Sequence, residues 1–116
     1  MQIKEMLGKT FTKVYQRDNA GDELVFENDE ESYVFYHCQD CCEEVYIESI
    51  TGDLKDLEGV PLDRVEESSG EIEDAYESGT WTFYKFATIK GYVDVRWVGE
   101  SNGYYSESVY FKVEKK

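Results

Sequence analysis

The amino-acid sequence predicts a mainly β fold: one antiparallel β-sheet domain, sandwich- or barrel-like, with one or two short helices. An α+β arrangement is the alternative. Ten tyrosines and a single proline in 116 residues favour pleated, half-buried strands. In the last third of the chain, Val93, Val95 and Trp97 alternate with Asp94 and Arg96, and this period of two indicates a sheet with one buried face. No repeat, low-complexity tract or linker interrupts the sequence, so residues 1–116 are expected to form a single domain.

The expected elements follow in order along the chain. Residues 1–8 favour a short helix that ends at Gly8, and the loop 18–22 favours a hairpin because its residues tolerate positive φ. One helical turn fits between two glycines, with Leu54 and Leu57 on the same side. Residues 68–78 are the most polar stretch and predict a loop or short helix. The expected strands are 11–17, 23–27, 33–38, 45–50, 62–67 (at a sheet edge), 80–89, 92–98 and 104–113, and the expected core includes Val93, Val95, Trp97, Val109, Phe111, Phe83 and Ile47.

The negative charge is concentrated in one part of the chain. The net charge is −14, and residues 18–77 hold 21 of the 26 acidic residues but only two basic ones, Lys55 and Arg64. The remainder of the chain is net positive, at +5. Such a field repels nucleic acid, phosphate metabolites and anionic membranes, and it attracts basic surfaces. Direct nucleic-acid and membrane binding are therefore disfavoured.

An acidic band is the first candidate binding surface. Its carboxylates lie within a short stretch of sequence and are Glu66, Glu67, Glu71, Glu73, Asp74 and Glu77. Alternate residues on a strand lie about 6.5 Å apart, so carboxylates at that interval resemble a row of phosphates to a DNA-binding protein. A solvated loop without a binding role remains the plainer interpretation.

A His/Cys cluster is the second candidate site. It comprises His37, Cys38, Asp40, Cys41, Cys42 and Glu43, and thiolate and imidazole are ligands that zinc prefers. Neighbouring residues on a strand point to opposite faces, however, and no second pair of ligands occurs elsewhere. A Cys/His nucleophile with Asp40 or Glu43 as the orienting group is also disfavoured, because catalytic pairs normally come from separate parts of a fold. We therefore expect reduced thiols, no bound metal or cofactor, no catalytic residues and no enzymatic activity.

No segment of the sequence resembles a signal peptide or reaches membrane-spanning length. Three cysteines cannot all pair within one chain, which favours a compartment that keeps thiols reduced. The expected location is therefore the cytoplasm.

Several stretches carry a family resemblance. They are HCQDCCE at 37–43, GDLKDL at 52–57, WTFYKFATIKG at 81–91 and RWVGESNGYYS at 96–106. Together they resemble an uncharacterised family of small bacteriophage and prophage proteins, a domain of unknown function, over about residues 35–111. The resemblance implies a phage-encoded accessory protein that acts in the host cell, and it implies no activity.

Three hypotheses follow from these observations. The leading one is a protein that binds and inhibits a basic host or anti-phage defence protein through its acidic face, with imitation of nucleic acid as one mode. The second is a small-ligand or metal-binding domain centred on the cluster from His37 to Glu43. The third is a minor virion or assembly component. Oligomeric state is left open.

Overall fold

A computed structural model describes residues 3–18, 22–38, 43–73, 78–102 and 106–116. Within these residues the chain is mainly β, as predicted, and its two short helices are 3₁₀ helices. The elements are η1 (Ile3–Met6), β1 (Lys13–Asp18), β2 (Asp22–Glu27), β3 (Glu31–Tyr36), β4 (Glu44–Thr51), η2 (Leu54–Leu57), β5 (Arg64–Glu71), β6 (Ser78–Thr88), β7 (Gly91–Ser101) and β8 (Tyr110–Lys115). In the part of the chain that is described, no helix has both the length and the apolar character needed to cross a membrane.

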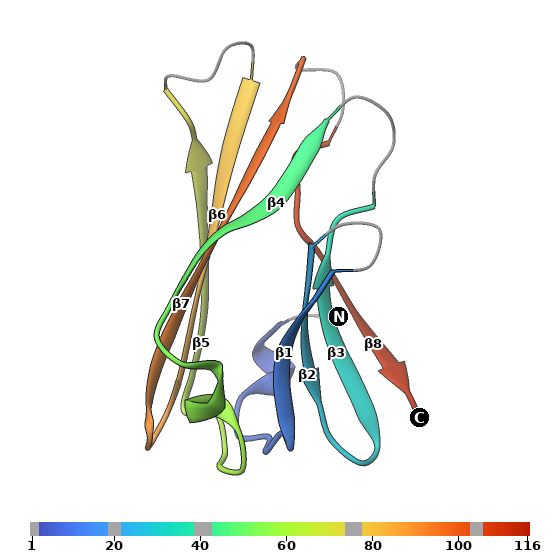
Figure 1. Ribbon diagram of the computed structural model, residues 1–116, viewed down its shortest axis with the longest axis vertical. Coiled ribbons are helices and arrows are strands. Elements are labelled where there is room, and N and C mark those ends of the chain that lie inside the picture. Colours follow the sequence, from blue (N-terminus) through green and yellow to red (C-terminus); the bar gives the residue numbers. More distant parts are fainter. Residues whose placement is uncertain (1–2, 19–21, 39–42, 74–77, 103–105) are drawn as a thin grey trace.

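The strands form two antiparallel four-stranded sheets that face each other as a sandwich (Figure 1). The first sheet has the order β1-β2-β3-β8, and the second has the order β4-β7-β6-β5. Aromatic side chains join the two layers: Phe26 lies 4.8 Å from Phe86, and Phe35 lies 4.8 Å from Tyr84, between ring centroids. Offset and edge-on ring contacts of this kind add to the free energy gained by burying apolar area.

The period of two in β6 and β7 divides the second sheet into an inner and an outer face. Tyr84, Phe86, Val93, Val95 and Trp97 point inward and are 0–1% exposed. The side chains between them form what we call the outer face: Trp81, Phe83, Lys85 and Ala87 of β6, and Tyr92, Asp94, Arg96 and Val98 of β7.

Most of the predicted core is confirmed. Val109, Phe111 and Ile47 are partly buried against it. The prediction for Phe83 was wrong: it alternates with the inward-pointing Tyr84 and therefore lies half-buried on the outer face.

Two strand assignments also required correction. The last strand begins at Tyr110 rather than near residue 104, and it pairs with β3 of the first sheet rather than with β7. The polar stretch 68–71 is the end of β5, not a loop, because it is hydrogen-bonded along Thr80–Phe83 of β6. An edge strand needs a backbone partner on one side only, and its exposed side chains can be polar. The polar residues 68–71 therefore did not show the apolar pattern by which a strand is predicted.

Carboxylates cover two of the sheet edges. The Ile47 N–H of β4 donates to Asp22 Oδ2 at 2.8 Å, and the Val14 N–H of β1 donates to Glu58 Oε2 at 2.9 Å. Unpaired edge groups are templates for association with another chain. Part of the acidic composition therefore serves to satisfy the backbone of this fold.

Candidate functional site

His37, the only histidine in the sequence, is buried with Glu43 rather than open to a ligand. Its Nε2 lies 2.9 Å from Glu43 Oε2, and the side chains are 3% and 0% exposed. The Nδ1 donates to the Ser108 carbonyl oxygen at 2.7 Å, since a carbonyl can only accept. The imidazole also stacks on Tyr110, with the ring planes 14° apart.

These contacts engage both nitrogens of the imidazole. Whichever of His37 and Glu43 holds the proton between them, no lone pair of the ring remains for a substrate proton or a metal ion. The pair is suited to joining the end of β3 to the start of β4.

The remaining members of the His/Cys cluster are separated or fall outside the described residues. Cys38 is a free, exposed cysteine, so it and His37 differ in environment as expected from their adjacency. Asp40, Cys41 and Cys42 lie outside the described residues. Among the residues that are described, no group of three or more His, Cys, Asp or Glu side chains is arranged to hold a metal ion.

The acidic band does not lie on one face of β5. Glu66 is on the outer face, where Arg64 Nε lies 3.1 Å from its Oε1. Glu67 points the other way and accepts a hydrogen bond from the Tyr84 hydroxyl; burial, together with this carboxylate, raises the pKa of Tyr84 far above its ordinary value. Glu71 and Glu73 are exposed at the end of the strand, and Asp74 and Glu77 lie outside the described residues.

A second group of carboxylates was not predicted from the sequence. Glu44 of β4 and Glu100 of β7 are direct partners in the register of the second sheet, so two like charges share one position on the outer face. Both side chains are exposed, and neither forms an ion pair within the described residues. Burial and the neighbouring charges of Glu100 and Glu44 raise the pKa of Tyr46, which lies beside them. The strand expected at 92–98 ended before Glu100, so nothing in the sequence indicated that this residue would lie opposite Glu44.

Aromatic side chains adjoin these carboxylates. The next row across the outer face is Tyr46, Val98, Trp81 and Gly70. Val98 is only 3% exposed although it points away from the core. A Cβ built on Gly70 would lie 2.7 Å from the indole ring of Trp81, so the ring rests directly over this glycine.

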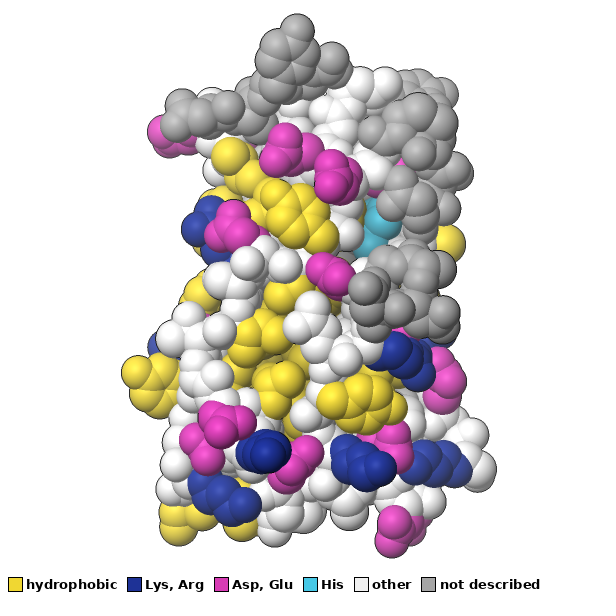
Figure 2. All heavy atoms as spheres, in the orientation of Figure 1, with side chains coloured by type: hydrophobic (Ala, Val, Ile, Leu, Met, Phe, Trp, Pro, Cys, Tyr) yellow, Lys and Arg dark blue, Asp and Glu magenta, His cyan; other side chains and the backbone are white. Residues whose placement is uncertain are grey.

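We call this region the acidic–aromatic patch: Glu44, Tyr46, Glu48, Trp81, Phe83, Val98 and Glu100. Figure 2 shows acidic side chains around hydrophobic ones near the end where β4 begins, while most lysine and arginine side chains lie toward the opposite end. Arg96 adjoins the patch and neutralises part of the patch's negative charge, because Arg96 Nη1 lies 3.5 Å from Glu48 Oε1.

Glu107 fixes the strands beside the patch. Its carboxylate accepts hydrogen bonds from Thr80 Oγ1 at 2.7 Å and from the Ser101 hydroxyl. Burial raises its pKa, but the hydroxyls of Ser101, Thr80 and Ser78 lower it by more, so the pKa lies below its ordinary value. Glu107 therefore remains charged and holds the ends of β6 and β7 together.

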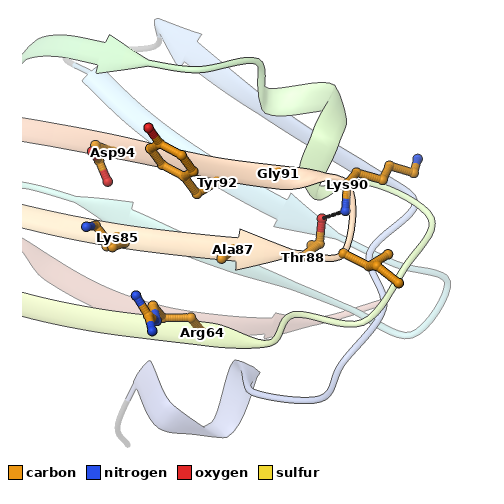
Figure 3. Close-up of a pocket in the computed structure, with 9 residues that line it drawn as sticks. Arg64, Lys85, Ala87, Thr88, Lys90, Gly91, Tyr92 and Asp94 are labelled. Carbon is orange, nitrogen blue, oxygen red and sulfur yellow. Dashed lines mark hydrogen bonds between the residues drawn. The ribbon is translucent and has the colours of Figure 1, made fainter.

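At the other end of the outer face lies a shallow depression with a volume of about 500 Å³, and its lining contains more basic than acidic side chains. Arg64 of β5, Lys85 and Ala87 of β6, and Tyr92 and Asp94 of β7 line it (Figure 3). The β6–β7 turn closes one end with Ile89 and Lys90. The backbone N–H of Lys90 donates to Thr88 Oγ1 at 3.1 Å, which fixes this turn.

Comparison with known proteins identifies the family of this chain but no activity for it. A protein-family model described as a domain of unknown function, DUF7448, matches residues 4–111. No curated protein and no solved structure gives a significant match. The function must therefore be inferred from the surface.

Proposed function

Since this chain belongs to the DUF7448 family, a domain of unknown function, we propose from its surface that it is a binding protein without catalytic activity that recognises a basic protein. The recognition surface is the acidic–aromatic patch, extended by the exposed carboxylates of β5. The resemblance to small phage and prophage proteins favours a host or anti-phage defence protein as the partner. Binding in the host cytoplasm would then inhibit that partner.

The facing pair of Glu44 and Glu100 is the observation that carries the proposal. Like charges directly opposite each other on neighbouring strands are destabilising, and no cation within the described residues offsets this pair. An arginine or lysine of a partner placed between them would remove the repulsion. The arrangement is costly in the free protein and favourable in a complex, as expected of a recognition surface.

The aromatic row gives this surface a centre. Tyr and Trp are enriched among the residues that dominate binding energy, and such residues lie inside a polar rim. Tyr46 and Trp81 are half-buried, and the carboxylates lie beside them. The patch therefore combines an aromatic anchor with a charged border that attracts a basic partner over distance.

The test is to isolate the partner by pull-down from host lysate and then to measure association rates at about 50 and about 300 mM salt. E44Q/E100Q should slow association about tenfold at low salt and much less at high salt, because steering acts on encounter and is screened. W81A should mainly accelerate dissociation. E66Q/E73Q tests whether β5 and the residues directly after it belong to the same surface, and it should slow association less because Arg64 already offsets Glu66.

The control is D29N/E30Q, which removes the same two charges from an exposed turn of the first sheet. It should leave the rates almost unchanged. If it slows association as much as E44Q/E100Q does, overall charge rather than the patch is responsible. If neither variant has an effect at either salt concentration, the acidic surface is not what the partner recognises.

A further inference from the structure

We infer that the depression at the β6–β7 turn is a second binding site, for a small ligand that combines a flat aromatic ring with a phosphate group, as in a nucleoside monophosphate. This site lies at the opposite end of the outer face from the acidic–aromatic patch. The inference is independent of the proposed recognition of a basic protein.

The strand register builds a notch at this position. Arg64, Ala87 and Tyr92 occupy one row across β5, β6 and β7, and they point to the outer face. Neighbouring strands lie about 4.8 Å apart, so the backbones of Arg64 and Tyr92 are separated by roughly 10 Å with only a methyl group between them. That gap suits one flat ring held between a guanidinium and a phenol. The cavity volume, about 500 Å³, falls within the range of small-molecule sites.

The charge of the depression is opposite to that of the molecule. Its lining contains Arg64, Lys85 and Lys90 but one acid, Asp94, in a chain with a net charge of −14. A phosphate monoester carries between about −1.5 and −2 charges at neutral pH. Glu66, which lies 3.1 Å from Arg64, offsets one of these charges. The depression is therefore left with a net charge of +1, opposite in sign to such a group.

Two of these cations retain capacity to bind an anion. Arg64 contacts Glu66 through Nε, and its terminal nitrogens have no other partner in the described part of the chain. Lys85 is the register partner of Asp94, yet no ion pair joins them; instead, Lys85 Nζ lies 5.9 Å from the centroid of the Tyr92 ring. The ammonium therefore lies over the face of the Tyr92 ring at the edge of the notch, where the phosphate of a ligand in the notch would reach it.

Exposed apolar surface marks the same place. Tyr92 is 61% exposed and Ile89 is 86% exposed, and both line the depression. A single exposed apolar side chain requires no explanation. Two exposed apolar side chains at one turn, next to the donors of Arg64 and Lys85, favour a ligand that covers apolar surface and carries negative charge.

The net charge of the protein selects against longer ligands. The expectation that the field repels phosphate metabolites holds at a distance, but charges are screened beyond about 8 Å at physiological salt. Inside the depression the local cations dominate. A nucleic-acid strand would extend along the outer face past Glu66 and Glu48, where it would be repelled. The site should therefore take one nucleotide rather than a strand.

The experiment is amide NMR titration of the ¹⁵N-labelled protein with adenosine monophosphate, adenosine, inorganic phosphate and a short single-stranded oligonucleotide. Adenosine monophosphate should shift the signals of Lys85, Ala87 and Tyr92 and saturate below about 5 mM. It should bind at least about tenfold more tightly than adenosine or phosphate, because only the nucleotide uses both ring and charge. The oligonucleotide should bind no more tightly than the monophosphate.

Matched variants localise the site. R64Q/K85Q should weaken binding of adenosine monophosphate about tenfold or more, since it removes two charge-assisted contacts. K112Q/K115Q, which removes the same charge from β8 of the other sheet, should not. Y92L should remove the preference for the nucleotide over inorganic phosphate.

Three outcomes would overturn the inference. They are no saturable binding of adenosine monophosphate, equal binding of phosphate or adenosine alone, and an equal loss of binding in K112Q/K115Q. Tighter binding of the oligonucleotide would instead identify a surface for nucleic-acid strands and would equally contradict a site for one nucleotide.

Discussion

His37 and Glu43 illustrate how the environment of a residue decides its chemistry. In sequence His37 is a candidate metal ligand or the base of a Cys/His pair, and Glu43 is a candidate for the carboxylate that orients it. In the structure the two side chains are almost completely buried and satisfy each other. Removing one partner from such a pair leaves an uncompensated polar or charged group in the interior, which costs several kcal/mol.

The first prediction concerns this pair. His37→Ala and Glu43→Ala should each lower the free energy of unfolding by about 3 kcal/mol, and the double variant should lose clearly less than the sum because the two groups depend on each other. Urea unfolding of the four proteins measures the coupling. Cys38→Ser is the control, and it should change stability by less than about 0.5 kcal/mol because the side chain is exposed. Additive losses would show that the two groups are energetically independent.

The sequence identified this cluster as unusual but could not predict its role. The partner of His37 Nδ1 is the carbonyl of Ser108, 71 positions away, and no local pattern indicates that contact. The acidic band presents the same difficulty. The adjacency of Glu66 and Glu67 places them on opposite faces, and whether each has a partner depends on Arg64 and Tyr84.

At the scale of the element, the β6–β7 hairpin was the most predictable part of the chain. Its buried and exposed residues alternate over both strands, and this pattern follows from the backbone geometry alone. The end of β5 and the partner of β8 were not predictable in this way. A polar edge strand has no apolar stripe, and the choice of sheet by β8 depends on packing of Phe111 against Phe35 of β3, 4.9 Å away.

The connection between β4 and η2 depends on a glycine that approaches the backbone of β7. Gly52 has φ +106°, and a Cβ there would lie 2.6 Å from the Tyr92 carbonyl oxygen. Gly8 has φ +83°, but a Cβ there would have no described heavy atom within 4 Å. Gly8→Ala should therefore cost about 1 kcal/mol from conformation alone. Gly52→Ala should cost at least about 2 kcal/mol more, because the backbone of β7 must move.

Urea unfolding of the two glycine variants measures the difference directly. Equal losses would mean that the β4–η2 connection adjusts without disturbing β7. A shifted Tyr92 amide signal in Gly52→Ala would show that the effect reaches the proposed nucleotide site, because Tyr92 lines it.

At the scale of the whole molecule, the acidic residues divide into two sets. Some satisfy the fold: Asp22 and Glu58 accept from edge N–H groups, and Glu107 holds β6 and β7. Others, such as Glu44 and Glu100, have no counterion in the described residues. Composition gave the total charge correctly but could not separate these sets, because the distinction depends on which side chains face each other across strands.

Salt should therefore stabilise the protein. A net charge of −14 destabilises the compact state by self-repulsion, whereas exposed ion pairs contribute little that salt can remove. Raising sodium chloride from about 20 to about 300 mM should increase the thermal midpoint by several degrees. E44Q/E100Q should begin with a higher midpoint and gain less from salt, because it lacks one of the repulsive pairs. A midpoint that falls with salt would mean that attractive ion pairs dominate the electrostatics of the fold.

The two tryptophans occupy contrasting environments, with Trp97 at 1% exposure in the core and Trp81 half-buried over Gly70 on the outer face. The protein thus carries two intrinsic fluorescent probes that report on different events. Emission from Trp97 should move to longer wavelength only when the sandwich opens, while emission from Trp81 should respond when a molecule covers the acidic–aromatic patch of the intact fold. In W81F only Trp97 remains, and its fluorescence reports on folding alone. Subtracting the emission of W81F from that of the parent protein leaves the emission of Trp81, which reports on binding at the acidic–aromatic patch without an attached label.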